Sequence, residues 1–379
     1  MKKFLALILA CTMVFALALT GCGGESSNAS NTPADNSSAN TPANNGSAAP
    51  SDSDEVYNIR IATWDSAAIP SGVTLQAAID KMNELGGGRI NAEGYYAETL
   101  LSSVDSLSGT AQGLADITYW QIDMVAGTTP LASMLTLPFT QNMPRSTGLT
   151  AAIRELVLPD DSPFQKEMEA MNLHWVDIKD TDGLSIHLVK DKPVYALNDL
   201  QGIKLIGVAE MQDYLALGGG NIVNMAATDF YTSLEKGVVD GSLHHMALVK
   251  IFAENELTKS HTLYGESEGL HVCSIGFVAN NEFWNSLPDD IKQIVSECLA
   301  GQQDAMIQAD IDMVEELVVD LEETNQPIYE VDGDQLESWY EAGDQIVNKW
   351  LDTHENDFDC NVRELYQQYM DLCSQHMGE

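Results

Sequence analysis

Strand-like and helix-like segments alternate along this chain, and their order restricts the possible folds more than any other feature. Residues 57–64 (YNIRIATW) alternate apolar and polar side chains before a turn, as a half-buried strand does. A helical pattern opens at Pro70 and ends at the glycine run 86–88. The next predicted elements are a strand at 89–96, a helix at 100–112 and a strand at 116–120. This alternation predicts an α/β fold in two lobes.

The second half of the chain continues the alternation and then becomes helical. A turn leads into a strand within residues 199–208. After the segment 287–290 (LPDD), apolar residues recur at helical spacing as far as Leu321, which predicts one long helix. The other helices expected in this half span residues 227–236, 334–353 and 361–375.

Residues 1–21 have the features of a lipoprotein signal peptide. Two lysines precede an apolar run from Phe4 to Leu19 that is too short to span a bilayer comfortably. The run ends in Leu19-Thr20-Gly21-Cys22, which resembles the bacterial lipobox, where the cysteine takes the lipid and becomes the new N-terminus. We therefore expect lipidation, with palmitate among the acyl groups, at Cys22. The alternative is an ordinary secretory signal followed by a chance cysteine.

Residues 22–54 form a second compositional unit. Beyond the cysteine they are mostly Ser, Asn, Ala, Thr, Pro and Gly without an apolar period, so they cannot bury enough surface to offset the entropy of ordering them. We expect a disordered tether between the lipid and a folded body at 55–379. The protein is thus predicted to be extracytoplasmic and anchored to the cell membrane.

Charge and motifs exclude several classes of function. The chain has 57 acidic and 18 basic residues, a formal net charge of −39, which repels nucleic acid and anionic headgroups. It contains no H-E-x-x-H, no G-x-S-x-G, no paired C-x-x-C and no EF-hand loop. The adjacent pair His244-His245 lacks the further donors that a metal needs. We therefore expect no catalytic residue, no metal and no cofactor.

The cysteines leave two possibilities open. Apart from Cys22, the chain beyond the signal peptide holds Cys273, Cys298, Cys360 and Cys373. An oxidising compartment allows disulfides such as Cys360–Cys373, whereas an anaerobic organism would keep all four thiols free.

A series of motifs then identifies a family. The segments 199–205 (DLQGIKL) and 231–241 (YTSLEKGVVDG) are the most specific. Three supporting motifs occur along the chain in the order expected for that family. They lie at 113–117 (GLADI), 135–139 (LTLPF) and 283–288 (FWNSLP). Together they resemble the solute-binding proteins of tripartite ATP-independent periplasmic (TRAP) transporters, of the dicarboxylate-binding type.

The resemblance implies a periplasmic-binding-protein-like fold with a ligand cleft between two lobes, hinge-connecting strands and a long helix. Lobe 1 would span about 56–178 with a late return segment and lobe 2 about 179–287, while helices within 288–379 brace both. The protein would bind a small organic solute, without chemistry on it, and deliver it to an ion-driven membrane permease. We expect a monomer.

The candidate ligand-binding residues follow from strand ends and from the family pattern, because ligands in open α/β sheets lie beyond the carboxyl ends of strands. They are Trp64, Asp65, Glu98, Trp120, Gln121, His187, Ile206, Ala227, His244 and His245.

Three of these positions depart from the family pattern. Ile206 stands where the family carries an arginine that holds a ligand carboxylate bidentately. Ala227 replaces a bulky aromatic residue, and His244 replaces an asparagine that often reaches the ligand. We therefore expect a solute other than a simple dicarboxylate, stacked near Trp64 or Trp120. A weaker anion contact is left to His187, His244 or His245.

Two other functions remain possible at this stage. A binding lipoprotein of an ATP-driven importer would share the tether and the two lobes. A surface hydrolytic enzyme would use Glu98 and Asp65 as acid and base, although no nucleophile stands at a suitable spacing.

Overall fold

The computed structural model describes residues 55–125 and 127–378, which belong to one compact unit. The predicted signal peptide, the lipidation site Cys22 and the tether lie outside the described residues. No helix among the described residues is both long and apolar enough to cross a membrane.

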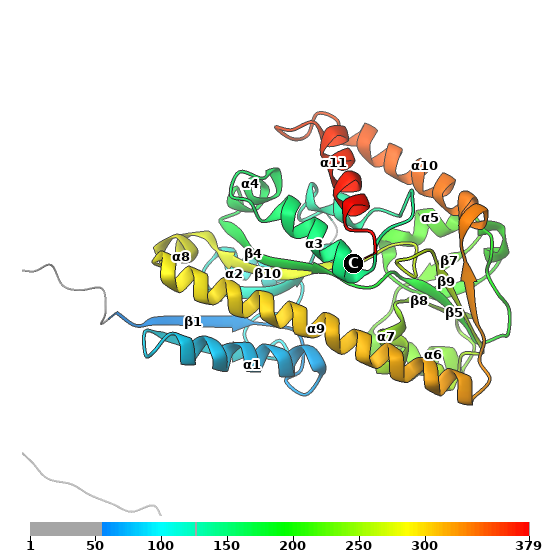
Figure 1. Cartoon of the computed structure of the whole chain (residues 1–379), viewed down its shortest axis with the longest axis horizontal. Coiled ribbons are helices and arrows are strands. Elements are labelled where there is room, and N and C mark those ends of the chain that lie inside the picture. Colours follow the sequence, from blue (N-terminus) through cyan, green and yellow to red (C-terminus); the bar gives the residue numbers. More distant parts are fainter. Residues whose placement is uncertain (1–54, 126, 379) are drawn as a thin grey trace, which may run out of the picture. The chain divides into compact units, whose positions relative to one another are not determined.

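The first sheet has five strands in the order β2-β1-β3-β10-β4. Figure 1 labels β1, β10 and β4 of this sheet. In chain order they are β1 (Tyr57–Ala62), β2 (Ile90–Tyr95), β3 (Ile117–Gln121), β4 (Leu173–Asp180) and β10 (Ser274–Asn280). Strand β1 pairs in parallel with β2 and β3, whereas β10 pairs antiparallel with β3 and β4. A late segment of the chain, β10, therefore returns to the first sheet and lies between β3 and β4.

The second sheet has six strands in the order β11-β9-β5-β8-β6-β7. They are β5 (Ser185–Leu188), β6 (Lys204–Ile206), β7 (Asn221–Val223), β8 (Gly241–His244), β9 (Ser260–Tyr264) and β11 (Ile328–Val331). Strand β6 is parallel to β7 and β8, and β5 is antiparallel to β8 and β9. The mixed α/β class with two sheets agrees with the sequence prediction.

Eleven α-helices surround the two sheets within the described residues. They are α1 (Pro70–Leu85), α2 (Ser106–Ala111), α3 (Ser146–Val157), α4 (Pro163–Glu169), α5 (Gln212–Ala216), α6 (Phe230–Glu235), α7 (Met246–Ile251), α8 (Asn281–Ser286), α9 (Asp289–Glu323), α10 (Glu337–Thr353) and α11 (Val362–Gln375).

Most predicted elements are confirmed, and two helices are shorter than expected. The segment predicted as a helix from residue 100 becomes helical only at Ser106, because Ser102 and Asp105 form a hydrogen-bonded turn through their side chains at 2.6 Å. The helix predicted from Ala227 begins with a 3₁₀ turn, and its α-helical part starts at Phe230.

Helix α9 contacts both sheet layers, as its length along the molecule in Figure 1 shows. Near its start, Ile291 and Leu299 pack in the core that includes β1 and α1. Near its end, Leu317 and Leu321 pack with Met246 of α7. Burial of apolar side chains near both ends of α9 holds the helix against the core of the first sheet and against α7 beside the second sheet.

The C-terminal helices contact both parts as well. In α10, Trp339 is fully buried in the core of the second sheet. In α11, Tyr369 is buried in the core of the first. The four described cysteines are free thiols, so the disulfide option is not realised in this structure.

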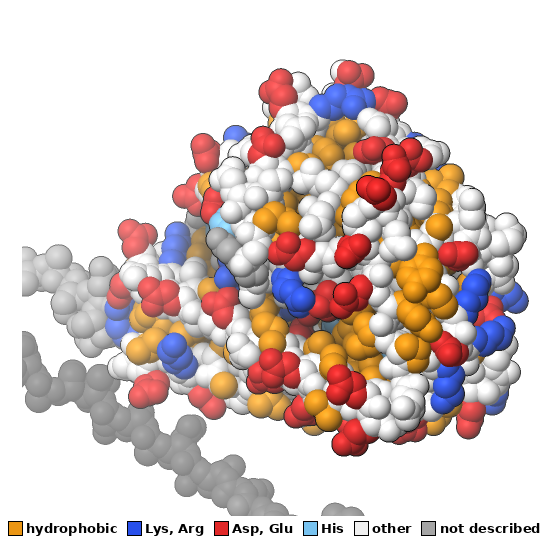
Figure 2. All heavy atoms as spheres, turned by 45° about the vertical axis from the view of Figure 1, so that its right-hand side comes forward, with side chains coloured by type: hydrophobic (Ala, Val, Ile, Leu, Met, Phe, Trp, Pro, Cys, Tyr) orange, Lys and Arg blue, Asp and Glu red, His pale blue; other side chains and the backbone are white. Residues whose placement is uncertain are grey.

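Acidic side chains are spread over the face seen in Figure 2, and basic side chains form smaller groups among them. This distribution follows the strongly negative net charge of the chain.

Candidate ligand-binding site

Two extended segments connect the sheets, and they pair with each other. One leads from β4 to β5 through residues 181–184, and the other leads back to β10 through residues 270–273. Three backbone hydrogen bonds join them, from Thr181 N to Cys273 O (3.0 Å), from Leu184 N to His271 O (2.7 Å) and from Leu270 N to Leu184 O (3.0 Å). We call this pair the crossing strands. A two-stranded connection of this kind is where a hinge between the sheets can bend.

Several polar side chains from both sheets gather beside the crossing strands, around Lys179 at the end of β4. The Lys179 side chain is only 3% exposed, and among the described residues one carboxylate, that of Asp310 on α9, lies within 4.0 Å of its ammonium. The charge of Lys179 also acts on Asp65 after β1 and on His245 after β8. We call Trp64, Asp65, Tyr119, Lys179, His245, Gln303 and Asp310 the junction cluster.

Burial sets the protonation of the acids in this cluster. Removal from water raises the pKa of Asp310 to about 6, although the positive charge of Lys179 works in the opposite direction. Burial likewise raises the pKa of Asp65, and Lys179 again opposes it. Burial lowers the pKa of His245 to about 3, and both Lys179 and His244 add to that effect. At neutral pH, His245 is therefore uncharged.

One wall of the junction cluster is aromatic. Trp64 is half-buried and stacks on Tyr119, with ring centroids 5.3 Å apart and planes 19° from parallel. The Tyr119 hydroxyl donates to Oε1 of Gln303 on α9 at 3.4 Å. An indole can stack on a flat ring or on the apolar face of a sugar, and Trp64 is the half-buried indole of this cluster.

The sequence predicted only part of this cluster. Trp64, Asp65 and His245 were candidates, whereas Lys179, Tyr119, Gln303 and Asp310 were not. Lys179 could have been noticed as the one basic residue near the end of a strand that alternates apolar and polar residues after Trp175 (LHWVDIKD).

The other two candidate histidines lie in a buried hydrogen-bonded network of the second sheet. His187 Nδ1 is 2.8 Å from His261 Nδ1, and His187 Nε2 is 3.0 Å from the His244 carbonyl. The His244 ring lies 3.1 Å from Glu254. Burial and the neighbouring His261 hold the pKa of His187 well below its usual range, so His187 is neutral. In contrast, Nδ1 of His245 is buried without a hydrogen-bond partner among the described residues.

Two candidates belong to apolar cores. Trp120 is 1% exposed and packs on Trp175 with ring centroids 5.8 Å apart, which places it in the core of the first sheet rather than where a ring could stack on it. Ile206 is also 1% exposed and packs with Leu234 and Val239. The position that we matched to the family arginine is thus filled by hydrocarbon contacts inside the second sheet.

The remaining candidates lie apart from the junction cluster. Gln121 donates to Oδ1 of Asp123 at 2.7 Å. Ala227 is exposed at the start of a 3₁₀ turn. Glu98 is exposed and accepts a hydrogen bond from Ser103 N at 2.8 Å, which lowers its pKa. A carboxyl group that ionises so readily is a poor general acid at neutral pH.

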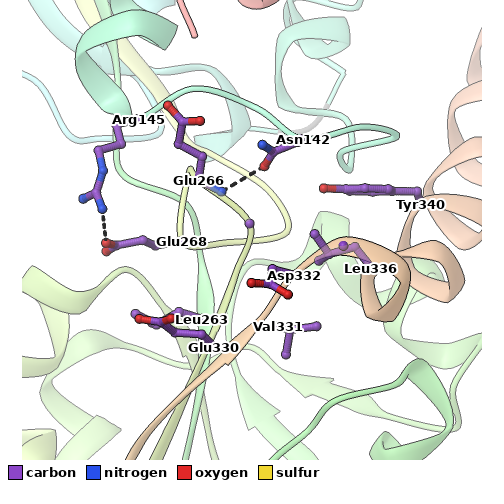
Figure 3. A pocket seen from close by; sticks show the side chains of 12 residues that line it. Asn142, Arg145, Leu263, Glu266, Glu268, Glu330, Val331, Asp332, Leu336 and Tyr340 are labelled. Atoms are coloured by element: carbon purple, nitrogen blue, oxygen red, sulfur yellow. Dashed lines mark hydrogen bonds and ion pairs between the residues drawn. The ribbon is translucent and has the colours of Figure 1, made fainter. Parts of the chain in front are cut away.

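The described residues also line cavities outside the junction cluster. One of about 500 Å³ has an acidic rim, where Arg145 pairs with Glu268 at 2.8 Å and the Glu266 backbone N–H donates to Asn142 at 2.8 Å (Figure 3). Another, of about 530 Å³, is more apolar and is lined by Leu137, Glu210 and Trp350 among others. Neither contains the residues predicted from strand ends.

The family model for bacterial extracellular solute-binding proteins of family 7 (DctP) matches residues 66–353. A solute-binding protein of Roseobacter denitrificans is 23% identical over 250 residues, covering 64% of this chain and 69% of that protein. One of Chromohalobacter salexigens is 23% identical over 231 residues, covering 60% of this chain and 66% of that protein.

Solved structures show the same fold. A TRAP periplasmic solute-binding protein of Desulfovibrio salexigens, described as an open complex, superimposes with a TM-score of 0.73 at 20% identity, covering 85% of this chain and 97% of that one. A marine metagenome protein specific for aromatic acids, bound to metahydroxyphenylacetate, gives 0.72 at 20% identity, covering 85% and 99%. A Chromohalobacter salexigens protein with bound D-glucuronate gives 0.68 at 19% identity, covering 83% and 99%. The chain belongs to family 7 of the bacterial extracellular solute-binding proteins, the DctP family of TRAP transporters, whose members bind solutes and are not enzymes.

Proposed function

We propose that this protein binds a small organic acid with one carboxylate at the junction cluster and delivers it to a TRAP permease. The observation that carries this proposal is the buried ammonium of Lys179, which has one carboxylate of the described residues, that of Asp310, within 4.0 Å. Burying a charge without close hydrogen-bonded partners is costly. A solute carboxylate would supply the missing partner as a charge-assisted hydrogen bond.

The neighbouring groups favour an acid with a ring and hydroxyl groups. The indole of Trp64 provides a flat apolar face, and the carboxyl groups of Asp65 and Asp310 can hydrogen-bond hydroxyls. Proteins of this fold have been solved with benzoate, with 3-hydroxybenzoate and with D-glucuronate. These three ligands share one carboxylate and a ring. Their chemistry supports an aromatic acid or a hexuronate rather than a dicarboxylate.

Binding would require the two sheets to separate and close. Lys179 and His245 are nearly excluded from solvent, so a solute reaches them only when the crossing strands bend. A solute that contacts both Asp65 of the first sheet layer and His245 of the second would stabilise the closed arrangement by its differential affinity.

The lipid anchor is part of the same proposal. Lipidation of Cys22 would hold the binding protein at the outer face of the cell membrane, near its permease, through the tether at 22–54. We propose that it acts there as a monomer. Because TRAP transport uses an ion gradient, uptake should persist without ATP and should fail when the gradient is collapsed.

The experiment is a thermal-shift screen of the purified body (residues 55–379) with benzoate, 3-hydroxybenzoate, D-glucuronate and succinate, followed by calorimetry. A solute that binds only the native state raises its unfolding temperature, and solution scattering should show compaction with the same solute. Stabilisation by none of the ring acids would contradict the proposed ligand class. Conversion of any of them into a new product would contradict the binding function itself.

A further inference from the structure

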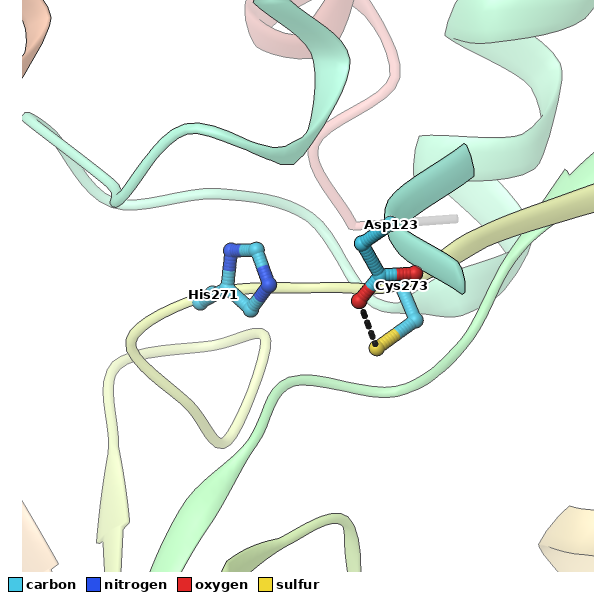
Figure 4. A group of neighbouring side chains, drawn as sticks. All are labelled: Asp123, His271 and Cys273. Carbon is cyan, nitrogen blue, oxygen red and sulfur yellow. Dashed lines mark hydrogen bonds between the residues drawn. The ribbon is translucent and has the colours of Figure 1, made fainter. Parts of the chain in front are cut away.

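A second polar cluster lies on the crossing strands. His271 and Cys273 belong to the return strand, and Asp123 lies in the 3₁₀ turn (Ile122–Met124) directly after β3 (Figure 4). Residues two apart in an extended chain share one face. The side chain between them, Val272, is buried in the core of the first sheet. We call Asp123, His271 and Cys273 the hinge cluster.

The donor atoms of the hinge cluster converge. One ring nitrogen of His271, the Cys273 sulfur and one carboxylate oxygen of Asp123 all lie within 4.8 Å of one another. The Cys273 thiol donates to Oδ2 of Asp123 at 3.5 Å. The sequence analysis missed this group because Asp123 is far along the chain from the other two residues.

His271 is the unexplained member of the cluster. It is 0% exposed, and neither of its ring nitrogens has a hydrogen-bond partner among the described residues. The backbone of Leu137 is near the ring and favours its charged form, but it does not reach hydrogen-bond geometry. Burying a polar atom without a hydrogen-bond partner is energetically unfavourable. Because both ring nitrogens of His271 lack a partner among the described residues, we infer that the ring binds a ligand or ion that is not part of the polypeptide.

We propose that the hinge cluster binds a divalent transition metal of the zinc class. Thiolate, imidazole and carboxylate are the ligands that zinc takes in proteins, and three protein ligands leave its fourth position for water. Tetrahedral zinc with bonds of about 2.0–2.3 Å holds its donor atoms roughly 3.4–3.7 Å apart. The distance of 3.5 Å between Oδ2 of Asp123 and Sγ of Cys273 already satisfies this. The His271 nitrogen lies within 4.8 Å of both atoms, so its ring has to approach by at most about 1.4 Å. Metal binding displaces the thiol proton of Cys273, and this proton is transferred to water or buffer.

The surroundings of the cluster fit a metal site. Gln121 donates to Oδ1 of Asp123 at 2.7 Å and thus orients the carboxylate from outside the ligand shell. The charge of Glu210 acts on both Asp123 and Cys273, so a further anion lies close by. Glu210 and Leu137, which act on the cluster, also line the apolar cavity of about 530 Å³. A metal there would link the end of β3 to the return crossing strand.

The test uses Co²⁺ as a spectroscopic probe and Zn²⁺ as the competitor, with the metal-free body at 55–379. We expect one equivalent of Co²⁺ to bind with a thiolate-to-metal charge-transfer band that Zn²⁺ abolishes. Cys273→Ser should remove the band, and His271→Ala should weaken binding by roughly a hundredfold. Calorimetry in buffers of different ionisation enthalpy should show release of a proton on binding.

The matched control is Cys360→Ser, which removes a partly buried thiol outside the cluster. It should keep the charge-transfer band at full strength, and circular dichroism should show that each variant is folded. If His271→Ala is folded and binds Co²⁺ as tightly as wild type, or if Cys273→Ser keeps the band, the metal is adventitious and the proposal is wrong. A failure to bind one equivalent of either metal would also overturn it. Because none of these readouts uses an organic acid, the outcome is independent of the proposed solute.

Discussion

Nζ of Lys179 at the end of β4 lies 4.0 Å from Oδ2 of Asp310 in the middle of α9, and both side chains are nearly excluded from solvent. At that distance the two groups attract each other but do not form a hydrogen bond. Asp310 therefore does not accept a hydrogen bond from the buried Lys179 side chain, and another acceptor can do so. This relationship leads to the first two predictions.

Replacing Lys179 by glutamine should weaken binding of the cognate organic acid by about 10- to 100-fold, because a hydrogen bond to a charged group contributes roughly 1.5–3 kcal/mol. Calorimetric titration of both proteins measures the change. Lys190→Gln is the control, since Lys190 is 73% exposed and pairs with Asp240 in the second sheet. Equal affinities for the wild type and Lys179→Gln would show that the solute binds elsewhere.

Dicarboxylates should bind more weakly than monocarboxylates of similar size. Lys179 neutralises one carboxylate, and a second would be desolvated near Asp65 and Asp310 without a cation. We expect succinate to bind at least tenfold more weakly than the best ring acid at low salt. Micromolar binding of succinate, about −8 kcal/mol, would contradict this prediction.

Asp180 should make the native state less stable as pH rises. Burial raises its pKa to about 7 from the ordinary 3.8, and its Oδ2 is buried without a hydrogen-bond partner among the described residues. Below about pH 4 the group is protonated in both the native and unfolded states, so its contribution to stability is fully present. Between about pH 4 and 7 the unfolded state releases the proton first, and stability falls by roughly 1.4 kcal/mol per pH unit.

Asp180→Asn should remove that component. The free energy of unfolding, measured with urea at several pH values, should rise relative to wild type from pH 4 to pH 7 and change little beyond. Subtracting the wild-type curve cancels the opposite contribution of the buried histidines. Asp312→Asn, an exposed position on α9, should give no such pH-dependent difference. A flat difference curve for Asp180→Asn would show that Asp180 ionises normally.

Gly269 should not tolerate a side chain, because at this position the backbone packs directly against the opposite crossing strand. A Cβ on Gly269 would lie 2.1 Å from the carbonyl carbon of Gly183 and 2.3 Å from the Leu184 nitrogen. Gly269→Ala should therefore destabilise the protein by about 3 kcal/mol, since backbone atoms cannot move aside cheaply. Gly301→Ala on α9, where a Cβ meets nothing within 4 Å, should instead stabilise it by about 0.5–1 kcal/mol. Similar midpoints of urea unfolding for the two variants would refute this account of the crossing.

The anchoring prediction concerns Cys22, at the end of the lipobox-like segment. Cys22→Ala should block lipid attachment, so that the protein partitions into the aqueous phase in detergent fractionation, whereas the wild type follows the detergent. Cys360→Ser should behave like wild type. If Cys22→Ala and wild type partition identically, the sequence is an ordinary secretory signal.

The sequence by itself determined the order of the elements and the family. Alternating residues in YNIRIATW predicted β1, and helical spacing from Ile291 to Leu321 predicted α9, because both signals are local in the chain. The motif at 231–241 (YTSLEKGVVDG) identified the family for the same reason, since its residues are contiguous.

Only the tertiary structure decided which side chains form the sites. Lys179 lies between Asp177 and Asp180 in the sequence and could have faced solvent, but β4 is paired with β10 and packed against α3, α4 and α9, which buries it. The same packing enclosed Trp120 against Trp175, although its position at a strand end had predicted a ligand contact. Asp123 meets His271 and Cys273 because the return strand brings a distant segment beside β3. Burial and proximity depend on contacts between segments far apart in the chain, and no local pattern of residues specifies them.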